Sequence, residues 1–247
     1  MDNFPTHAGR VAVVTGAGRG IGAAIAIGLA ARGARVVVAD MTPPDATVAT
    51  IGANAVGVAA DVSSPEGWAA IEQAAAAAFG DVDIVVNNAA YYPNHSIDDL
   101  DFETWRRTMA VNLDAQYLSA KQFVPAMRRN GWGRFVGISS NSIGLNVQGM
   151  SHYMASKMGI IGFMRGLAND VANDGITCNA ILPGLTHTVA TEAQGEEARR
   201  AVWQAQAIQR FAEPDEIVGP VLFLTSDDAA FMTAQAVVVD GGQYRVG

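Results

Sequence analysis

Residues 11–40, VAVVTGAGRGIGAAIAIGLAARGARVVVAD, constrain the fold of this chain more than any other stretch. An apolar run over 11–14 leads into a glycine-dense turn. An Ala/Ile/Leu-rich stretch of helical character follows, and a second apolar run ends on the acid Asp40. Strand, glycine turn, helix, strand and acid, in that order, are typical of a dinucleotide-binding βαβ unit. Glycines let the backbone approach a phosphate, and the helix N-terminus offers the phosphate unpaired N–H groups. The segment therefore predicts nucleotide binding.

Strand-like runs alternate with helix-like segments along the rest of the chain. Strands are expected at 11–14, 36–39, 55–59, 83–87, 134–138, 176–182 and 236–239. Helices are expected briefly from Asp45, then at 65–79, 101–129, 151–173 and 214–224, with loop and helix over 191–210. Such alternation builds a parallel sheet with helices on both faces. With no linker or repeat, residues 1–247 are expected to form one doubly wound α/β domain with a seven-stranded sheet.

Composition and charge exclude several classes of protein. The net charge of −8 argues against binding to nucleic acid or to an anionic membrane surface, since both attract basic proteins. The N-terminus MDNFPTHAGR lacks the apolar region of a signal peptide, and the longest uncharged stretch, 135–156, is too rich in Ser, Asn and Gly for a membrane span. We expect a cytoplasmic protein.

Cysteine and histidine give no sign of a metal centre. The single cysteine, Cys178, excludes an internal disulfide and sits in an apolar run that favours a core position. The histidines are scattered without metal-ligand spacing. We expect no metal site.

A tyrosine and a lysine stand four residues apart in the helix expected at 151–173, as Tyr153 and Lys157 in HYMASK. Positions i and i+4 share one face of a helix, although such a pair also arises by accident. An ammonium beside a phenol lowers the pKa of the tyrosine from about 10 and makes it a general acid/base for hydroxyl–ketone interconversion. Asn88, Ser140 and Gly184 follow three successive strands, and the carboxyl ends of such strands are where open α/β sheets bind ligands.

These motifs together resemble those of the short-chain dehydrogenase/reductase family, in its single-domain branch. They are T-G-x-x-x-G-x-G over 15–22, Asn87-Asn88-Ala89-Ala90, Asn112 in the long helix, Ser140 thirteen residues before Y-x-x-x-K, and Asn179-x-x-x-Pro183-Gly184. The resemblance runs from Val11 to Gly242. It implies a single Rossmann domain, oxidoreductase activity on CH–OH groups, and homo-oligomers, commonly homotetramers, paired through the helices at 101–129 and 151–173.

The resemblance also implies a role for each matching residue. Ser140 would hold the substrate oxygen, Tyr153 would exchange a proton with it, and Lys157 would lower the pKa of Tyr153 and bind the nicotinamide ribose. Asn112 would hold a water that links Lys157 to solvent. The other implied cofactor-binding residues are Gly16, Arg19, Gly20 and Ile21 at the pyrophosphate, Asp61 and Val62 at the adenine, Asn88 at a ribose, and Gly184, Thr186 and Thr188 near the carboxamide. Ala90 and Thr186 depart from the family's usual Gly and Ile or Val, in places where backbone contacts can survive.

The acid at the end of the second strand favours NAD over NADP. The Asp40 carboxylate can accept the ribose hydroxyls and would repel a 2′-phosphate, and no basic residue follows it. Arg19 favours NADP instead, because an arginine at that position can bind a 2′-phosphate.

The function expected is hydride transfer between NAD(H) and a small-molecule secondary alcohol or ketone. Pocket candidates are Tyr91, Tyr92, Pro93, Asn141, Ser142, Leu145, His152, Leu185 and Trp203. Many are apolar or aromatic, which suits a hydrophobic substrate. Segments such as FVPAMRRNGWGR and SHYMASK also look similar to family members acting on aromatic secondary alcohols. The alternative is a catalytically idle NAD-binding sensor or scaffold, and a sugar-nucleotide isomerase is opposed by the T-G-x-x-x-G-x-G spacing. The sequence leaves open the substrate, the stereochemistry and the choice between dimer and tetramer.

Overall fold

The computed structural model describes residues 6–188, 200 and 202–245. Across these residues, one parallel sheet of seven strands has the order β3-β2-β1-β4-β5-β6-β7. The strands are β1 (Val11–Thr15), β2 (Arg35–Asp40), β3 (Ala55–Ala59), β4 (Ile84–Asn87), β5 (Gly133–Ile138), β6 (Ile176–Pro183) and β7 (Ala236–Val239). The chain steps outward from β1 to β3, returns to the centre and steps the other way from β4 to β7. This confirms the predicted doubly wound Rossmann fold, with its switch point between β1 and β4.

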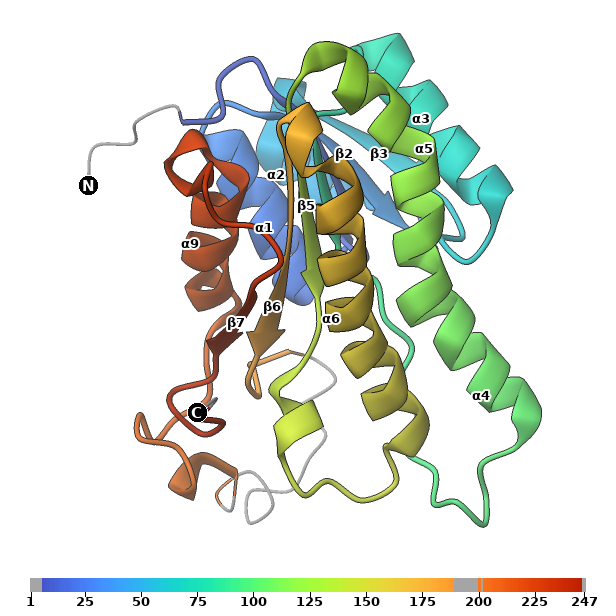
Figure 1. The fold of residues 1–247 in the computed structure, drawn as a ribbon, viewed down its shortest axis with the longest axis vertical. Coiled ribbons are helices and arrows are strands. Elements are labelled where there is room, and N and C mark those ends of the chain that lie inside the picture. The colour runs from blue at the N-terminus through green and yellow to red at the C-terminus, as the bar shows by residue number, and fades with distance from the viewer. Residues whose placement is uncertain (1–5, 189–199, 201, 246–247) are drawn as a thin grey trace.

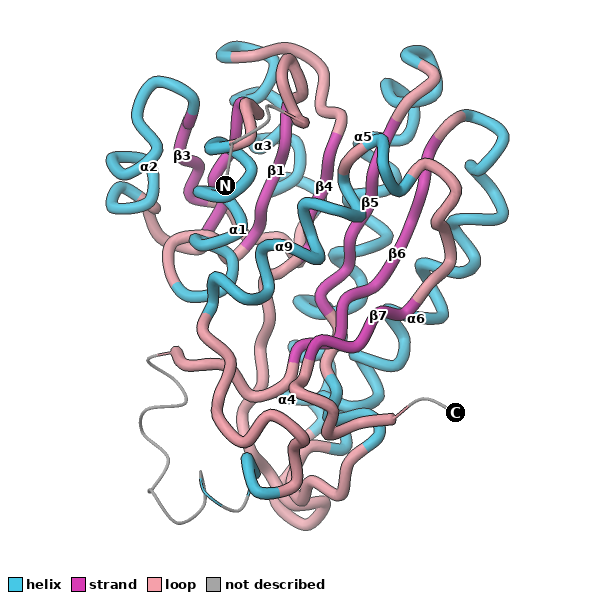
Figure 2. Tube along the Cα trace, turned by 90° about the vertical axis from the view of Figure 1, so that its left-hand side faces the viewer, coloured by secondary structure: helices cyan, strands magenta, loops and turns pink. Residues whose placement is uncertain are grey.

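Helices cover both faces of the sheet (Figures 1 and 2). They are α1 (Gly20–Ala31), α2 (Asp45–Ile51), α3 (Pro65–Ala78), α4 (Phe102–Met109), α5 (Ala115–Asn130), α6 (Ser151–Val171) and α9 (Pro214–Thr225). In Figure 2, α1 and α9 lie in front of the strands. The opposite face is covered by α3, α5 and α6, which stand together on the right of Figure 1.

Two apolar clusters, one on each face, hold the layers together. Ile25 and Leu29 of α1 pack with Ile217 of α9 beneath one face. Trp68 of α3 and Phe123 of α5 meet edge to face under the other, with ring centroids 6.0 Å apart. The central strands are buried along their length, which explains their near-continuous Val and Ile runs.

Several element boundaries differ from the sequence prediction for identifiable reasons. The single helix expected at 101–129 is interrupted by a π-helical turn, Ala110–Asp114, that separates α4 from α5. The helix expected at 151–173 ends at Val171, and a 3-10 turn then leads to Gly175 at a φ of 75°. The strand expected to end at 182 reaches Pro183, since that residue still pairs with Val239.

Part of the predicted segment 191–210 lies outside the described residues, which exclude 189–199 and 201. The single-domain organisation over 1–247 therefore stays a prediction. Among the helices that the structure describes, none is both long and apolar enough to cross a membrane.

Candidate functional site

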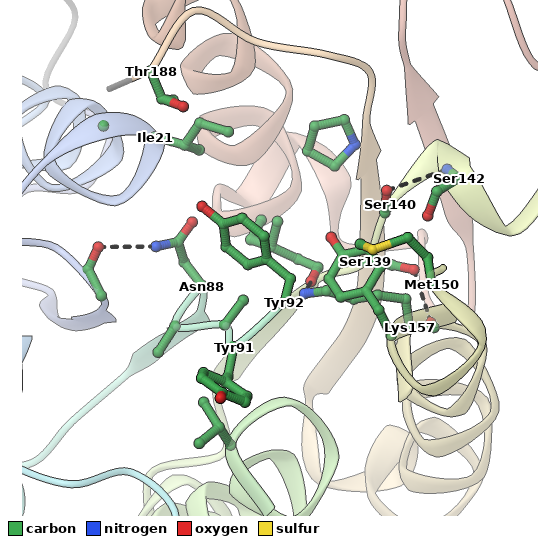
Figure 3. Close-up of a pocket in the computed structure, with 18 of the residues that line it drawn as sticks. Ile21, Asn88, Tyr91, Tyr92, Ser139, Ser140, Ser142, Met150, Lys157 and Thr188 are labelled. Atoms are coloured by element: carbon green, nitrogen blue, oxygen red, sulfur yellow. Dashed lines mark hydrogen bonds between the residues drawn. The ribbon is translucent and has the colours of Figure 1, made fainter. Parts of the chain in front are cut away.

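A cleft of about 1660 Å³ opens at the carboxyl ends of the strands. Its lining comes from the turns after β1 to β6, and Figure 3 shows part of it. Small-molecule pockets occupy roughly 300–1000 Å³, so this cleft has room for a large ligand and a second molecule beside it. Its position at the β1/β4 switch point is the one where ligands bind in open α/β sheets.

The turn between β1 and α1 packs so closely against its neighbours that side chains at its glycines would collide with them. Gly16 has a φ of 60°, a left-handed conformation that favours glycine. A Cβ on Gly22 would collide with the carbonyl oxygen of Gly16 and would lie 2.5 Å from Asn88 Nδ2. α1 begins directly after this turn, with an extended Arg19 as its N-cap and no acidic residue in its first turn. The N-terminus of α1 is therefore a positive, hydrogen-bond-donating site for an anion such as a pyrophosphate.

Asp40 lies across the cleft floor from that turn. Its Oδ2 accepts a 2.9 Å hydrogen bond from the Gly18 N–H, and its Oδ1 accepts one of 2.8 Å from the Met41 N–H. A Cβ on Gly18 would lie 2.9 Å from Asp40 Oδ2, so the glycine permits this approach. Asp61, Val62 and the exposed Arg19 also line the cleft. The predicted adenosine-side residues are thus brought together.

Thr15 and Asn88 join the ends of β1 and β4. Thr15 Oγ1 accepts hydrogen bonds of 3.0 and 3.1 Å from the N–H groups of Asn88 and Ala89. Asn88 Nδ2 donates in return to the carbonyl oxygens of Thr15, at 2.8 Å, and Gly16, at 3.1 Å. Thr15 opens the T-G-x-x-x-G-x-G motif but was not among the predicted site residues. Its hydroxyl satisfies the strand-end N–H groups that would otherwise be orphaned.

The loop after β6 closes the cleft beside the glycine turn. Gly184 has no space for a side chain, because a Cβ there would lie 2.7 Å from Asp240 Cβ. Thr186 Oγ1 donates to the Gly184 carbonyl at 3.0 Å. Thr188 faces the turn, since a Cβ on Gly20 would lie 3.5 Å from Thr188 Cγ2. The cavity is lined by the predicted residues Ile21, Gly184, Thr186 and Thr188.

Asn112 occupies the π-helical turn and is fully buried. Its Oδ1 accepts a 2.7 Å hydrogen bond from the Tyr91 N–H. Its Nδ2 donates to the Tyr91 carbonyl at 3.0 Å and to Ser156 Oγ at 2.9 Å. π-turns are frequent at functional sites because the extra residue redirects a side chain. Here the redirected amide ties the loop after β4 to α6 beside Tyr153.

Ser140, Tyr153 and Lys157 line the same wall of the cleft. Ser140 follows β5, and its Oγ accepts a 3.2 Å hydrogen bond from the Ser142 N–H (Figure 3). The loss of solvent around Tyr153 raises its pKa to about 12, partly opposed by a hydrogen bond with Ser140. The phenol of Tyr92 adds to the rise.

Lys157 is 2% exposed, and its Nζ donates a 2.7 Å hydrogen bond to the Ile138 carbonyl. Burial lowers the pKa of Lys157 to about 7. Ser139, which the sequence analysis did not select, donates to the Lys157 carbonyl at 2.8 Å and fixes α6 against the end of β5.

The expected lowering of the Tyr153 pKa by Lys157 is therefore wrong for this arrangement. Lys157 Nζ lies 5.4 Å from the centre of the Tyr153 ring and is directed to a carbonyl. Desolvation acts on both groups and favours their neutral forms. The spacing of four residues predicts that Tyr153 and Lys157 share one face of the helix. It does not predict how far that face is shielded from solvent.

The predicted substrate-pocket residues divide into two groups. Tyr91, Tyr92, Asn141, Ser142, Leu145 and Leu185 line the cleft. Pro93, His152 and Trp203 do not line it. His152 is buried with its Nε2 2.9 Å from the Pro93 carbonyl, and Trp203 packs on Phe211 with ring centroids 5.4 Å apart. Tyr92 is half-exposed, and its ring centroid lies 6.0 Å from that of Tyr153. Tyr91 points toward the helices below it (Figure 3), where Arg107 stacks on its ring.

No group of three or more His, Cys, Asp or Glu side chains in the described part of the chain is arranged to hold a metal ion. Cys178 is buried in β6, and burial raises the pKa of its thiol to about 12, as befits the predicted core position.

Several known proteins to which this chain is similar are reductases or dehydrogenases. Residues 16–243 match the family model described as Enoyl-(Acyl carrier protein) reductase. The chain is 36% identical over 240 residues to the 3-oxoacyl-(acyl-carrier-protein) reductase FabG of Vibrio cholerae, covering 96% of this chain and 98% of that one. It is 34% identical over 250 residues to L-rhamnose 1-dehydrogenase (NAD(P)(+)) of Azotobacter vinelandii, covering 95% and 96%.

Among solved structures, a putative gluconate dehydrogenase from Agrobacterium tumefaciens superposes with a TM-score of 0.93 at 30% identity, covering 99% of this chain and 100% of that one. A putative short-chain alcohol dehydrogenase from Sinorhizobium meliloti gives 0.91 at 34% identity, covering 96% of each. Fold, motifs and full-length relatives agree, and the chain belongs to the short-chain dehydrogenase/reductase family of oxidoreductases.

Proposed function

We propose that this protein transfers a hydride between NAD(H) and a secondary alcohol or ketone, with Tyr153 as general acid/base. One observation carries the proposal: Ser140, Tyr153 and Lys157 share a wall of the cleft that begins at the glycine turn. This places proton-transfer groups beside space that fits a dinucleotide. An idle NAD-binding sensor, the alternative function, would have no need of these groups together.

A dinucleotide fits the residues present. The left-handed Gly16, the crowded Gly22 and the uncapped N-terminus of α1 form a cradle that a Cβ would fill. Gly16, Arg19, Gly20 and Ile21 would hold the pyrophosphate side, Asp61 and Val62 the adenine, and Asn88, Gly184, Thr186 and Thr188 the nicotinamide side. The nicotinamide ring supplies the hydride acceptor or donor at its C4 atom.

Asp40 supports NAD rather than NADP. Its carboxylate lines the cleft next to the glycine turn and is held there by the Gly18 N–H. It would accept ribose hydroxyls and repel a 2′-phosphate. Arg19 is exposed and forms no ion pair within the described residues, so it remains able to oppose this preference.

In the reductive direction, Ser140 would donate a hydrogen bond to the substrate carbonyl, and Tyr153 would deliver its phenolic proton to that oxygen as the carbon accepts hydride. A pKa of about 12 keeps Tyr153 protonated at neutral pH, so the ligand-free site is set as an acid. Oxidation uses the same atoms in reverse and requires Tyr153 to lose its phenolic proton to solvent before it accepts the hydroxyl proton, so it should be favoured by high pH. Lys157 would bind the ribose. Asn112 would hold the loop at Tyr91 against α6 through its hydrogen bonds to Tyr91 and Ser156.

A hydrophobic or aromatic substrate is supported by the apolar side chains that line the part of the cleft around Ser140. Tyr92 presents a half-exposed ring to Tyr153, and Leu145, Met150 and Leu185 add apolar surface. The named relatives act on acyl-carrier-protein thioesters and on sugars, so both classes belong in the test. A homotetramer and a cytoplasmic location stay predictions.

The test is cofactor reduction by the purified protein with NAD and NADP across aromatic, aliphatic and sugar alcohols, and the reverse reaction with the matching ketones and a 3-oxoacyl substrate. Tyr153→Phe is the matched control, because it removes one hydroxyl. General acid/base catalysis contributes roughly 10²–10⁴-fold, and a loss of that size is expected while NADH still binds. Tight NADH binding with no turnover of any substrate would favour the idle sensor.

A further inference from the structure

Asp240, the residue after β7, is 6% exposed and accepts four hydrogen bonds. Its Oδ1 accepts from the N–H groups of Gly242, at 2.9 Å, and Gln243, at 3.1 Å. Its Oδ2 accepts from the Tyr244 N–H at 2.7 Å and from Asn141 Nδ2 at 3.1 Å. Three of these bonds fold the C-terminal turn, residues 240–244, around the carboxylate. The fourth leaves the turn and reaches the residue that follows Ser140.

Asn141 directs both of its amide hydrogens to this turn. It is 5% exposed, and Nδ2 donates to Asp240 Oδ2 and to Gln243 Oε1, each at 3.1 Å. Asn141 is also the first residue of a 3-10 turn, Asn141–Gly144, whose N-cap is Ser140. Any movement of Asn141 therefore moves the segment that carries the Ser140 hydroxyl.

The C-terminal turn packs between two loops that border the cleft. A side chain on Gly144 would collide with the Tyr244 ring, so the 3-10 turn lies directly against that ring. On the other side, the backbone of Gly184 lies against Asp240. Gln243 itself lines the cleft. The turn thus touches the loops after β5 and β6.

We propose that Asp240 and Asn141 are positioning residues, whose hydrogen bond fixes Ser140 and the C-terminal turn as one wall of the substrate site. The pair is separated by 99 residues in sequence. The effect of this hydrogen bond on turnover rests on the proposed function. Its role in holding the Ser140 segment against the C-terminal turn does not.

The experiment exchanges the donor and the acceptor. Asp240→Asn puts an amide donor against the Asn141 amide, and Asn141→Asp puts a carboxylate against the Asp240 carboxylate. The double variant Asp240→Asn/Asn141→Asp restores one donor and one acceptor. Asp98→Asn makes the same chemical change at an exposed carboxylate and is the control.

Each single variant is expected to lower kcat roughly tenfold, since small misplacements of a reacting group cost 10- to 100-fold. The double variant should recover part of the lost kcat, because the pair between residues 141 and 240 is re-formed while the bond from the Tyr244 N–H to Asp240 Oδ2 stays lost. Loss of the Ser140 hydrogen bond raises the Tyr153 pKa, so the pH profile of each single variant should shift upward and return in the double. A merely structural defect would not produce that reversible shift.

Hydrogen exchange of residues 139–145 tests the link without any substrate. Faster exchange in the single variants and recovery in the double supports the link, even if the wild-type protein turns over nothing and the proposed function fails. Single variants with unchanged kcat, pH profile and exchange would overturn the proposal. A double variant no better than the singles would do the same.

Discussion

The cofactor half and the substrate half of the cleft are built in different ways. The cofactor half is mostly backbone: one continuous stretch, 11–40, supplies the glycine turn, the α1 N-terminus and Asp40. The substrate half is mostly side chains drawn from distant segments, including Tyr92, Ser140 and the turn at Asp240. A backbone cradle tolerates little change, whereas a wall of side chains can be altered one group at a time. Substitutions should therefore act more severely, and less selectively, in the first half.

The largest effect is expected from Gly22→Ala, which breaks the backbone cradle. The new methyl group would collide with the Gly16 carbonyl and crowd Asn88 Nδ2 at 2.5 Å. Overpacking costs about 1–3 kcal/mol, so the Kd for NADH should rise roughly 10- to 100-fold. Titration of NADH fluorescence measures it. Gly219→Ala, on exposed α9 with no atom within 4 Å of the added Cβ, is the control and should leave the Kd unchanged.

The next effect concerns Asp40, the side chain that we propose favours NAD over NADP. Asp40→Ser removes the charge that would repel a 2′-phosphate, and the NAD:NADP ratio of kcat/KM should fall by roughly tenfold. Asp61→Asn removes a charge elsewhere in the cleft and should leave the ratio as it was. A ratio that does not respond to Asp40→Ser would show that Arg19 or another group sets the choice.

A smaller and more selective effect is expected in the substrate half. Tyr92→Ala removes the ring 6.0 Å from Tyr153 and should reduce kcat/KM for aromatic alcohols by about two- to tenfold, from the 0.5–1.5 kcal/mol of an aromatic contact. Small aliphatic alcohols should be affected less. Tyr92→Phe keeps the ring but loses the hydroxyl that raises the Tyr153 pKa, so its pH profile should shift to lower pH. Equal losses for all alcohols in Tyr92→Ala would contradict a specificity role.

The smallest effect on activity is expected at His7, far from both halves in the fold. His7 is buried, its Nε2 lies 2.9 Å from Thr225 Oγ1, and burial lowers its pKa to about 4. Between this value and the unfolded value of 6.5, the unfolded chain binds the additional proton. Stability should therefore be complete above pH 6.5 and decline as the pH falls toward 4. His7→Gln should flatten that decline in thermal unfolding curves, with kcat at neutral pH unchanged.

The same contrast explains what the sequence could predict. The βαβ unit, its glycine turn and the alternation of strands and helices follow from patterns confined to short stretches. Most of the individual cofactor residues were expected from the family resemblance, and their roles stay predictions. The π-helical turn at Asn112 escaped detection because its 29-residue surroundings keep a helical pattern through the bulge, and only its contacts with Tyr91 and Ser156 reveal it.

Long-range contacts and burial account for most of what was missed. The Asp240–Asn141 bond joins residues 99 positions apart, and no local pattern marks it. The pKa of Tyr153 depends on how dry its surroundings are, which the Tyr153–Lys157 spacing does not encode. His152 and Trp203 were plausible pocket residues by position, but their side chains pack against Pro93 and Phe211 instead.

Transfer of deuterium tests the central claim most directly. The protein is mixed with NAD and a secondary alcohol carrying deuterium on the carbinol carbon, 1-phenylethanol first, and the mass of the reduced cofactor is measured. One deuterium per reduced cofactor is expected from the substrate that turns over, and the rate of deuterium transfer should fall by roughly 10²–10⁴-fold with Tyr153→Phe. Reduced cofactor without deuterium, or deuterium transfer that survives Tyr153→Phe at the full rate, would contradict the claim.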